Sequence, residues 1–171
     1  REVWATHTVI DKIGEGITLS DGTGHFEIFN AKMQELTGYT IDEVNRAGDF
    51  NSLIYPDPEE RNKTLAGISR VISGRGLHET ESEIHAKDGS RKTVLVTTSL
   101  IRYRDRDMFL SVWRDITAQR QAEAALHKQE MFTVQLIQGS SAPTFVLDRE
   151  HKVIIWNAAL EALTGIESRS V

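Results

Sequence analysis

The pattern of hydrophobic and polar positions predicts a set of short strands in the first two thirds of the chain. Five segments carry the alternation, the β-branched residues or the flanking turns typical of strands. They are residues 17–21, 26–29, 77–86, 91–101 and 108–116. The first pair flanks the turn Asp21-Gly22-Thr23-Gly24, and the next pair flanks Lys87-Asp88-Gly89-Ser90. Each pair is therefore predicted to form an antiparallel hairpin.

Helices are predicted between the second and third strands. Asn30 is suited to cap a helix that ends at Gly38, and Thr40 with Glu43 forms a capping box for a second helix. A third helix over residues 58–73 has Pro at its first position and apolar residues at helical spacing. The order strand-strand-helices-strand-strand-strand predicts an α+β domain in which helices cover one face of an antiparallel sheet.

From residue 117 the pattern becomes helical. Thr117 is suited to cap a helix over residues 118–138, which contain neither Gly nor Pro. One stripe of this helix holds its less polar residues at spacings of three and four. The stripe consists of Ala122, Ala125, Leu126, Gln129, Phe132, Thr133 and Leu136. The stripe predicts that two copies of the chain pair through this helix as a parallel coiled coil. We expect a second contact of the dimer through an N-terminal helix at residues 1–12.

An internal repeat organises the chain. Residues 19–38 read LSDGTGHFEIFNAKMQELTG, and residues 146–165 read VLDREHKVIIWNAALEALTG, each 127 positions after its counterpart without a gap. Asp21 matches Asp148, and Asn30 matches Asn157. An ungapped match of this kind marks a duplicated structural unit. The second copy stops after its first helix, so we expect it to be incomplete.

Composition narrows the classes of function. Twenty Lys and Arg against twenty-five Asp and Glu give a net charge of −5, which argues against nucleic-acid partners and against binding to anionic membranes. The absence of cysteine excludes disulfides, thiolate metal sites and a cysteine nucleophile. No apolar run approaches the roughly 20 residues that span a bilayer. We expect a soluble, cytoplasmic chain without direct membrane contact.

Several short motifs, in this order and spacing, resemble a PAS domain with its C-terminal PAC portion. They are Asp21-Gly22, Asn30-Ala31, Leu36-Thr37-Gly38-Tyr39, Pro58-Glu59-Glu60-Arg61, Lys87-Asp88-Gly89 and Asp115-Ile116-Thr117. The resemblance implies the PAS fold, a five-stranded antiparallel sheet with helices on one face around a potential ligand cavity. It also implies a bacterial multi-domain signalling protein, most often a sensor histidine kinase of a two-component system.

The resemblance also implies a domain organisation. We expect an N-terminal flanking helix (1–12), a PAS/PAC domain (13–117), a connecting signalling helix (118–138) and the incomplete start of a second PAS domain (139–171). In PAS proteins the Asp-Ile-Thr that closes the last strand couples to the outgoing helix. Signal transmission is therefore expected at Asp115, Ile116 and Thr117. The expected partners are a second copy of the chain and the adjacent PAS and output domains.

Twelve residues would line a cavity in this domain. They are Met33, Leu36, Ile54, Leu65, Ile68, Ile72, Ile84, Val94, Val96, Thr98, Ser111 and Trp113. The alternative is that they simply form the packed core. The small polar residues Thr80, Ser82, Thr98 and Ser111 are predicted to face inward, where a ligand, water or backbone carbonyls could be their partners.

The sequence gives little support for the cofactors that other PAS proteins bind. Light-sensing relatives bond flavin through a cysteine, which this chain lacks, and the position of their flavin-contacting Gln is Trp113. Haem-binding relatives take a ligand from the long helix, and residues 58–73 contain no histidine. No catalytic motif or metal-ligand spacing is present. We expect no flavin, haem, metal or catalysis, and leave an unidentified small ligand open.

Two functions remain open from the sequence. The first is a sensory module in which a small molecule or a redox cue shifts the sheet and strand 108–116 passes the shift to the following helix. The second is a ligand-free dimerisation and relay module with a packed core. The inward polar residues favour the first, and Trp113 favours the second because its ring would fill the interior.

Overall fold

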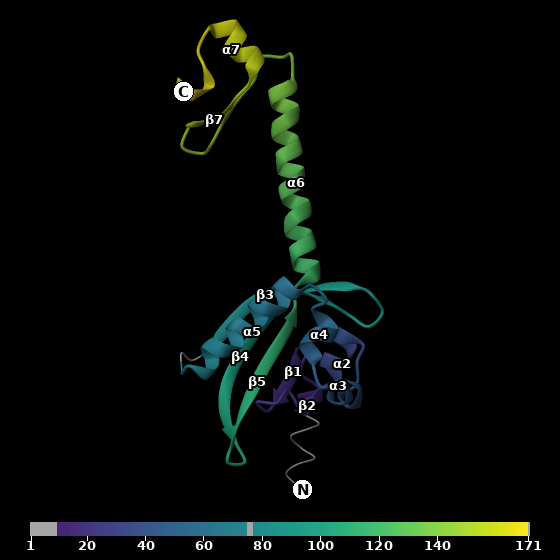
Figure 1. Cartoon of the computed structure of the whole chain (residues 1–171). Coiled ribbons are helices and arrows are strands. Elements are labelled where there is room, and N and C mark those ends of the chain that lie inside the picture. The colour runs from purple at the N-terminus through teal and green to yellow at the C-terminus, as the bar shows by residue number, and fades with distance from the viewer. Residues whose placement is uncertain (1–9, 75–76, 171) are drawn as a thin grey trace. The chain divides into compact units, whose positions relative to one another are not determined.

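The computed structural model describes residues 10–74 and 77–170 of the chain (Figure 1). The chain divides after Ala118 into two compact units, which are described separately below. Most of the N-terminal helix predicted at residues 1–12 lies outside the described residues, and within them Ile10 and Asp11 are helical.

The first unit contains the predicted five-stranded antiparallel sheet. Its strands are β1 (Gly16–Ser20), β2 (Phe26–Phe29), β3 (His78–His85), β4 (Arg91–Tyr103) and β5 (Arg106–Asp115). They lie in the order β2-β1-β5-β4-β3. The first strand therefore pairs with the last, with Gly16 opposite Trp113 and Thr18 opposite Ser111. This pairing places the beginning and the end of the unit side by side in the middle of the sheet.

Four helices connect β2 to β3 and pack against the sheet (Figure 1). They are α2 (Ala31–Thr37), α3 (Ile41–Ala47), α4 (Phe50–Ile54) and α5 (Pro58–Ile72). Helix α2 packs against β1, α3 against β2, and α5 against β3 and β4. The predicted α+β fold, with helices packed against a five-stranded antiparallel sheet, is confirmed.

The predicted helix signals are the ones that the structure uses. The side chain of Asn30 caps α2, Thr40 and Glu43 form the capping box of α3, and Asp57 caps α5. Helix α4 was not predicted. Its five residues are too few for a hydrophobic period to be recognised, although Asp49 caps it by accepting a hydrogen bond from the backbone of Ser52.

Aromatic rings form the centre of the core. Phe26, Phe29 and Phe50 meet edge to face, with centroid distances of 5.2 to 5.6 Å. Trp113 joins them at 6.1 Å from Phe50. Edge-to-face contacts between aromatic rings add about 0.5–1.5 kcal/mol beyond the burial of their surface. The interior is thus filled by large side chains from β2, α4 and β5.

Both edges of the sheet are protected. Along β3 the glutamates Glu79, Glu81 and Glu83 are exposed while Ser82 and Ile84 are buried, which confirms the predicted alternation. At the other edge, the side-chain amide of Asn45 in α3 accepts a hydrogen bond from the backbone N–H of Phe26 and donates to its carbonyl, at 2.8 and 3.0 Å. Acidic residues and a capped backbone both disfavour the addition of another strand.

Three of the four polar residues predicted to face inward are buried and bond to other side-chain hydroxyls, while Thr80 is half-buried. The hydroxyls of Thr98 and Ser111 are 2.9 Å apart across β4 and β5, and the hydroxyl of Ser82 is 2.9 Å from that of Tyr55. Burial raises the pKa of Tyr55, so its phenol stays protonated. The sequence predicted a ligand, water or backbone carbonyls as partners, whereas the structure pairs these groups with side-chain hydroxyls. Within the part of the chain that the structure describes, every buried side-chain N or O atom has a partner.

The second unit begins with the long helix α6 (Thr117–Gly139), whose first two residues belong to the first unit. It continues with a hairpin of β6 (Phe145–Leu147) and β7 (Val153–Trp156), the helix α7 (Ala158–Thr164) and a 3-10 turn (Ser168–Ser170). Leu163 in α7 is 70% exposed, whereas Leu36, its counterpart 127 positions earlier, is 3% exposed. The apolar face of α7 therefore has little of the cover that α2 has.

We predict that Tyr55→Phe lowers the free energy of unfolding by about 1–3 kcal/mol, because it leaves the buried hydroxyl of Ser82 without its partner. The Tyr55→Phe/Ser82→Ala double variant should lose less free energy of unfolding than the sum of the losses of the two single variants, because neither hydroxyl is then left buried without a partner. Urea denaturation followed by tryptophan fluorescence measures both. Tyr103→Phe, at a half-buried tyrosine near the β4–β5 turn, is the control and should change stability by less than about 0.5 kcal/mol. Additive losses would contradict the pairing.

Candidate functional site

Most of the predicted cavity residues lie in the core of the first unit. Met33, Leu36, Ile54, Ile84, Val94, Val96 and Trp113 belong to one buried cluster. Thr98 and Ser111 are also buried and bond to each other. Leu65 is 44% exposed, and the side chains of Ile68 and Ile72 lie outside what the structure describes. Whether any of them contacts a ligand stays a prediction.

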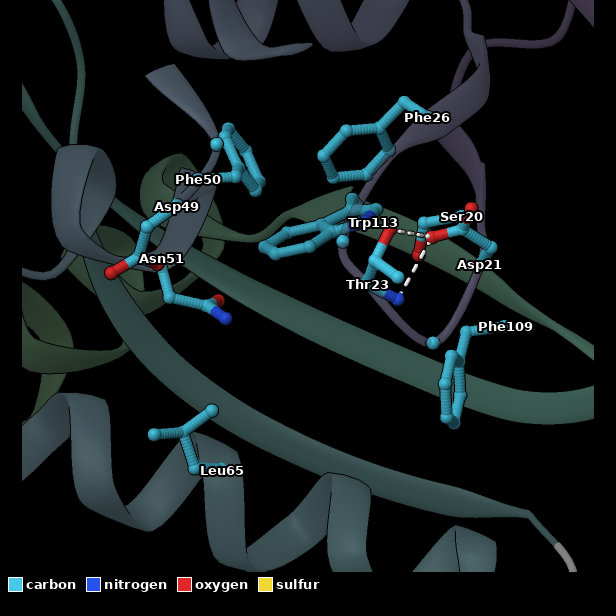
Figure 2. A pocket seen from close by; sticks show the side chains of 13 residues that line it. Ser20, Asp21, Thr23, Phe26, Asp49, Phe50, Asn51, Leu65, Phe109 and Trp113 are labelled. Atoms are coloured by element: carbon cyan, nitrogen blue, oxygen red, sulfur yellow. Dashed lines mark hydrogen bonds between the residues drawn. The ribbon is translucent and has the colours of Figure 1, made fainter. Parts of the chain in front are cut away.

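A hollow of about 260 Å³ opens beside this cluster (Figure 2). It lies between the β1–β2 turn, helix α4, helix α5 and strand β5. Its lining consists of Ser20, Asp21, Gly22, Thr23, Gly24, Phe26, Gly48, Asp49, Phe50, Asn51, Leu65, Phe109 and Trp113. Of the ten predicted residues whose side chains the structure describes, Leu65 and Trp113 are in this lining. Sequence reasoning recognised the Asp21–Gly24 segment as a turn and had no signal that α4 would face it.

Asp21 is already engaged in its own turn. One carboxylate oxygen accepts hydrogen bonds from the backbone and the hydroxyl of Thr23, at 2.9 and 2.6 Å (Figure 2). The same oxygen accepts from the backbone of His25 at 3.1 Å. The hydroxyl of Thr23, followed by these backbone N–H groups, lowers the pKa of Asp21. The carboxylate therefore shapes the rim of the hollow as an anion at neutral pH.

Trp113 forms the inner wall of the hollow. Its ring packs edge to face on Phe50, and its indole N–H donates to the hydroxyl of Thr18 at 3.3 Å. The only polar group of this side chain is thus bonded inside the protein. A guest in the hollow would meet the tryptophan as an apolar surface.

The end of β5 is tied to the start of α6 by a compact set of hydrogen bonds. One carboxylate oxygen of Asp115 accepts from the backbone N–H and the hydroxyl of Thr117, at 2.9 and 2.6 Å. The same hydroxyl accepts from the backbone N–H of Thr93 on β4 at 2.9 Å. Ile116 is buried, and its N–H donates to the carbonyl of Thr93 at 2.9 Å.

This joint corrects one detail of the sequence prediction. Thr117 was expected to cap the helix, but it is the first helical residue, and Asp115 accepts its N–H. The hydroxyl of Thr117 instead faces β4. The three residues predicted to transmit a signal thus come together at one place, where two neighbouring strands meet the first turn of α6.

Comparison with known proteins agrees with this geometry. A family model described as a PAS domain matches residues 14–118, more than half of the chain. The chain belongs to the PAS domain family.

Two curated relatives of this PAS chain are named as signalling proteins. Two-component system protein A of Emericella nidulans is 31% identical over 112 residues, which cover 64% of this chain and 16% of that protein. Sensor histidine kinase TmoS of Ectopseudomonas mendocina is 26% identical over 148 residues, which cover 85% of this chain and 15% of that protein. The chain thus spans about one sixth of the length of these relatives.

Solved structures share the fold. The crystal structure of a PAS domain from Colwellia psychrerythraea superimposes with a TM-score of 0.58 at 18% identity, covering 69% of this chain and 99% of that one. At this level of identity the likeness concerns the fold alone.

Among residues 10–74 and 77–170, no helix is both long enough and apolar enough to cross a membrane. No three His, Cys, Asp or Glu side chains of that same part of the chain gather as a metal-binding group.

We predict that Thr117→Val loosens the joint, because the isosteric methyl group can neither accept from Thr93 nor donate to Asp115. Amide hydrogen exchange at Thr93 and in the first turn of α6 should accelerate by about tenfold, as expected for a lost hydrogen bond with a partly buried partner. Thr133→Val is the matched control, since its hydroxyl bonds only within α6, to the carbonyl of Gln129. Equal exchange in the two variants would show that Thr117 does not hold the joint.

Proposed function

We propose that this PAS chain is a cytoplasmic sensory and relay module of a signal-transduction protein, with a histidine kinase as the most frequent output of such arrays. A small molecule or redox cue acts on the first unit, and the resulting shift passes through Asp115, Ile116 and Thr117 into α6. The module itself carries no catalytic activity. The names of its two relatives, a two-component system protein and a sensor histidine kinase, support this class of function.

The observation that carries the proposal is the joint between β5 and α6. Strand β5 lies in the middle of the sheet and contributes Trp113 to the hollow, and two residues later the chain enters the joint. A displacement of Trp113 by a guest therefore acts on the strand that leads directly into the helix. Residues 77–117, which form β3 to β5 and the joint, would be the PAC portion.

A small energy difference is enough for such a relay. A ligand shifts a two-state equilibrium only by its difference in affinity for the two states, and a few kcal/mol changes the populations by one or more orders of magnitude. The hydrogen bonds of Thr117 and Asp115 contribute energies of this size. A modest change in the sheet would therefore be enough to break the hydrogen bonds of the joint and form them in another arrangement.

The second unit is proposed to be the start of another PAS domain. The support is the ungapped repeat and the matching local structure. Asp148 accepts from the backbone of Glu150 and Lys152 as Asp21 does from Thr23 and His25. Gly165 ends α7 in the left-handed conformation as Gly38 ends α2.

A ligand-free relay with a packed core is the alternative function. The edge-to-face aromatic cluster favours this alternative because its rings fill the core. The paired inward hydroxyls also favour it, because every buried polar side-chain atom of the described residues already has a hydrogen-bond partner within the protein. The hollow beside Trp113 favours the sensory function. In both cases the joint and α6 have the same role.

We predict that native mass spectrometry of the purified chain shows one small molecule retained without a covalent bond, with the ultraviolet and visible spectrum reporting any chromophore. Asn51→Trp should abolish the added mass, because the larger side chain from α4 would occupy the hollow. Lys128→Ala, on α6 and outside the lining of the hollow, is the control and should retain the added mass. A bare protein mass for the unsubstituted chain would exclude the sensory function in favour of the ligand-free relay.

The proposed homodimer would use α6. All of its residues are at least partly exposed, and Leu126, Phe132 and Leu136 of the predicted stripe are each 59% exposed. A stripe at spacings of three and four from Ala122 to Leu136 is complementary to itself, so a second copy of the chain in parallel orientation would cover it.

We predict that the chain is a dimer by light scattering at high micromolar concentration and that Leu126→Glu converts it to a monomer. The substitution places a charge in the seam, where it would be buried without a partner. Ala124→Glu introduces the same charge about 160° around the helix from Leu126, on the side away from the stripe, and should leave the dimer intact. A monomeric unsubstituted chain, or equal effects of both variants, would rule out this interface.

A further inference from the structure

One buried asparagine in the first unit bonds four separate pieces of backbone. Asn30 is 3% exposed, and its amide nitrogen donates to the carbonyls of Ile10 and Glu15, each at 3.0 Å. Its side-chain oxygen accepts from the backbone of Ile17 at 2.8 Å and of Met33 at 2.9 Å. One side chain thus joins the end of the incoming helical segment, the segment before β1, the strand β1 itself and the first turn of α2.

The second unit repeats this arrangement residue by residue. Asn157 is fully buried, and its amide nitrogen donates to the carbonyls of Ile137 and Ala142, at 3.0 and 2.9 Å. Its side-chain oxygen accepts from the backbone of Thr144 at 2.9 Å and of Leu160 at 3.0 Å. Each partner lies 127 positions after its counterpart in the first unit. Here the incoming helix is α6, because Ile137 belongs to its last turn.

Helix capping alone does not explain the choice of asparagine. Aspartate, serine and threonine cap helices about as well as asparagine does, and in this chain Asp49 caps α4, Asp57 caps α5 and Thr40 caps α3. Only a side-chain amide offers two N–H donors together with an acceptor oxygen. At both repeat positions the two donors are used, and one of them holds the incoming helix.

We propose that Asn30 and Asn157 are junction residues, which couple the helix entering a unit to the first strand and first helix of that unit. The proposal rests on the proposed relay function, because it supplies the step after α6. Motion that leaves the first unit through Thr117 would reach the second at the carbonyl of Ile137. Asn157 then passes it to Thr144 at the start of the β6–β7 hairpin and to Leu160 in α7.

The substitution Asn157→Asp tests the junction. Aspartate keeps the oxygen that accepts from Thr144 and Leu160, but it loses both donors and sets a carboxylate oxygen against the carbonyls of Ile137 and Ala142. In hydrogen exchange on the full chain, amides of residues 136–142 should exchange at least about tenfold faster, while the amide of Leu160 stays protected.

Two controls make the test specific. Asn30→Asp is the matched change in the first unit and should leave exchange at residues 136–142 unaltered. Thr164→Val removes a hydrogen bond to the carbonyl of Leu160 at the other end of α7 and should also leave that region unaltered. Unchanged exchange at residues 136–142 in Asn157→Asp, or no protection there in the unsubstituted chain, would overturn the proposal.

A second measurement covers the case in which Asn157→Asp unfolds the unit. Asn157→Ser retains a capping oxygen but is too short to reach Ile137. Spin labels at the exposed positions Gln135 and Arg149 should then give a distance distribution at least twice as broad as in the unsubstituted chain. An equally narrow distribution would overturn the junction. Since neither readout involves a ligand or an output, either result is independent of whether the first unit senses a cue.

Discussion

The antiparallel pairing of β1 with β5 is the constraint on which the rest of the first unit depends. These strands are separated by four helices and three other strands in the sequence, so the pairing closes a long loop at an entropic cost that the buried core must offset. Gly16 makes the contact with Trp113 and α2 close enough. A Cβ atom there would lie 2.9 Å from the sulfur of Met33 and 3.1 Å from the Cβ of Trp113. Because of this pairing, the chain enters and leaves the unit through neighbouring central strands.

That arrangement would allow a packed domain to act as the proposed relay. The aromatic cluster of Phe26, Phe29, Phe50 and Trp113 is dense, and dense interiors respond to a perturbation by moving as a whole rather than by local compression. Strand β5 carries one of those rings and ends in the hydrogen bonds of Asp115 and Thr117. A guest beside Trp113 and a displacement of α6 would therefore both act on strand β5.

Local rules made most of the fold predictable from the sequence. The caps at Asn30, Thr40 and Asp57 and the turns at the two hairpins depend on residues within a few positions, and each was recognisable as written. Helix α4 was missed because five residues carry no period. The partnerships of Tyr55 with Ser82 and of Asn30 with Ile10 join residues 27 and 20 positions apart, so they depend on the tertiary fold. The hollow was missed for the same reason, since it is bounded by segments that meet only after folding.

The identical spacing of the two asparagine junctions has a consequence for how the length of such a chain can change in evolution. In each unit the amide reaches backward 20, 15 and 13 positions and forward 3, so the whole arrangement moves as a block with the 127-residue period. Recombination between equivalent codons of the two copies would remove or add one full period and still leave every junction with its partners. A chain that gained or lost one full period in this way would therefore keep each asparagine amide at the same spacing from its backbone partners.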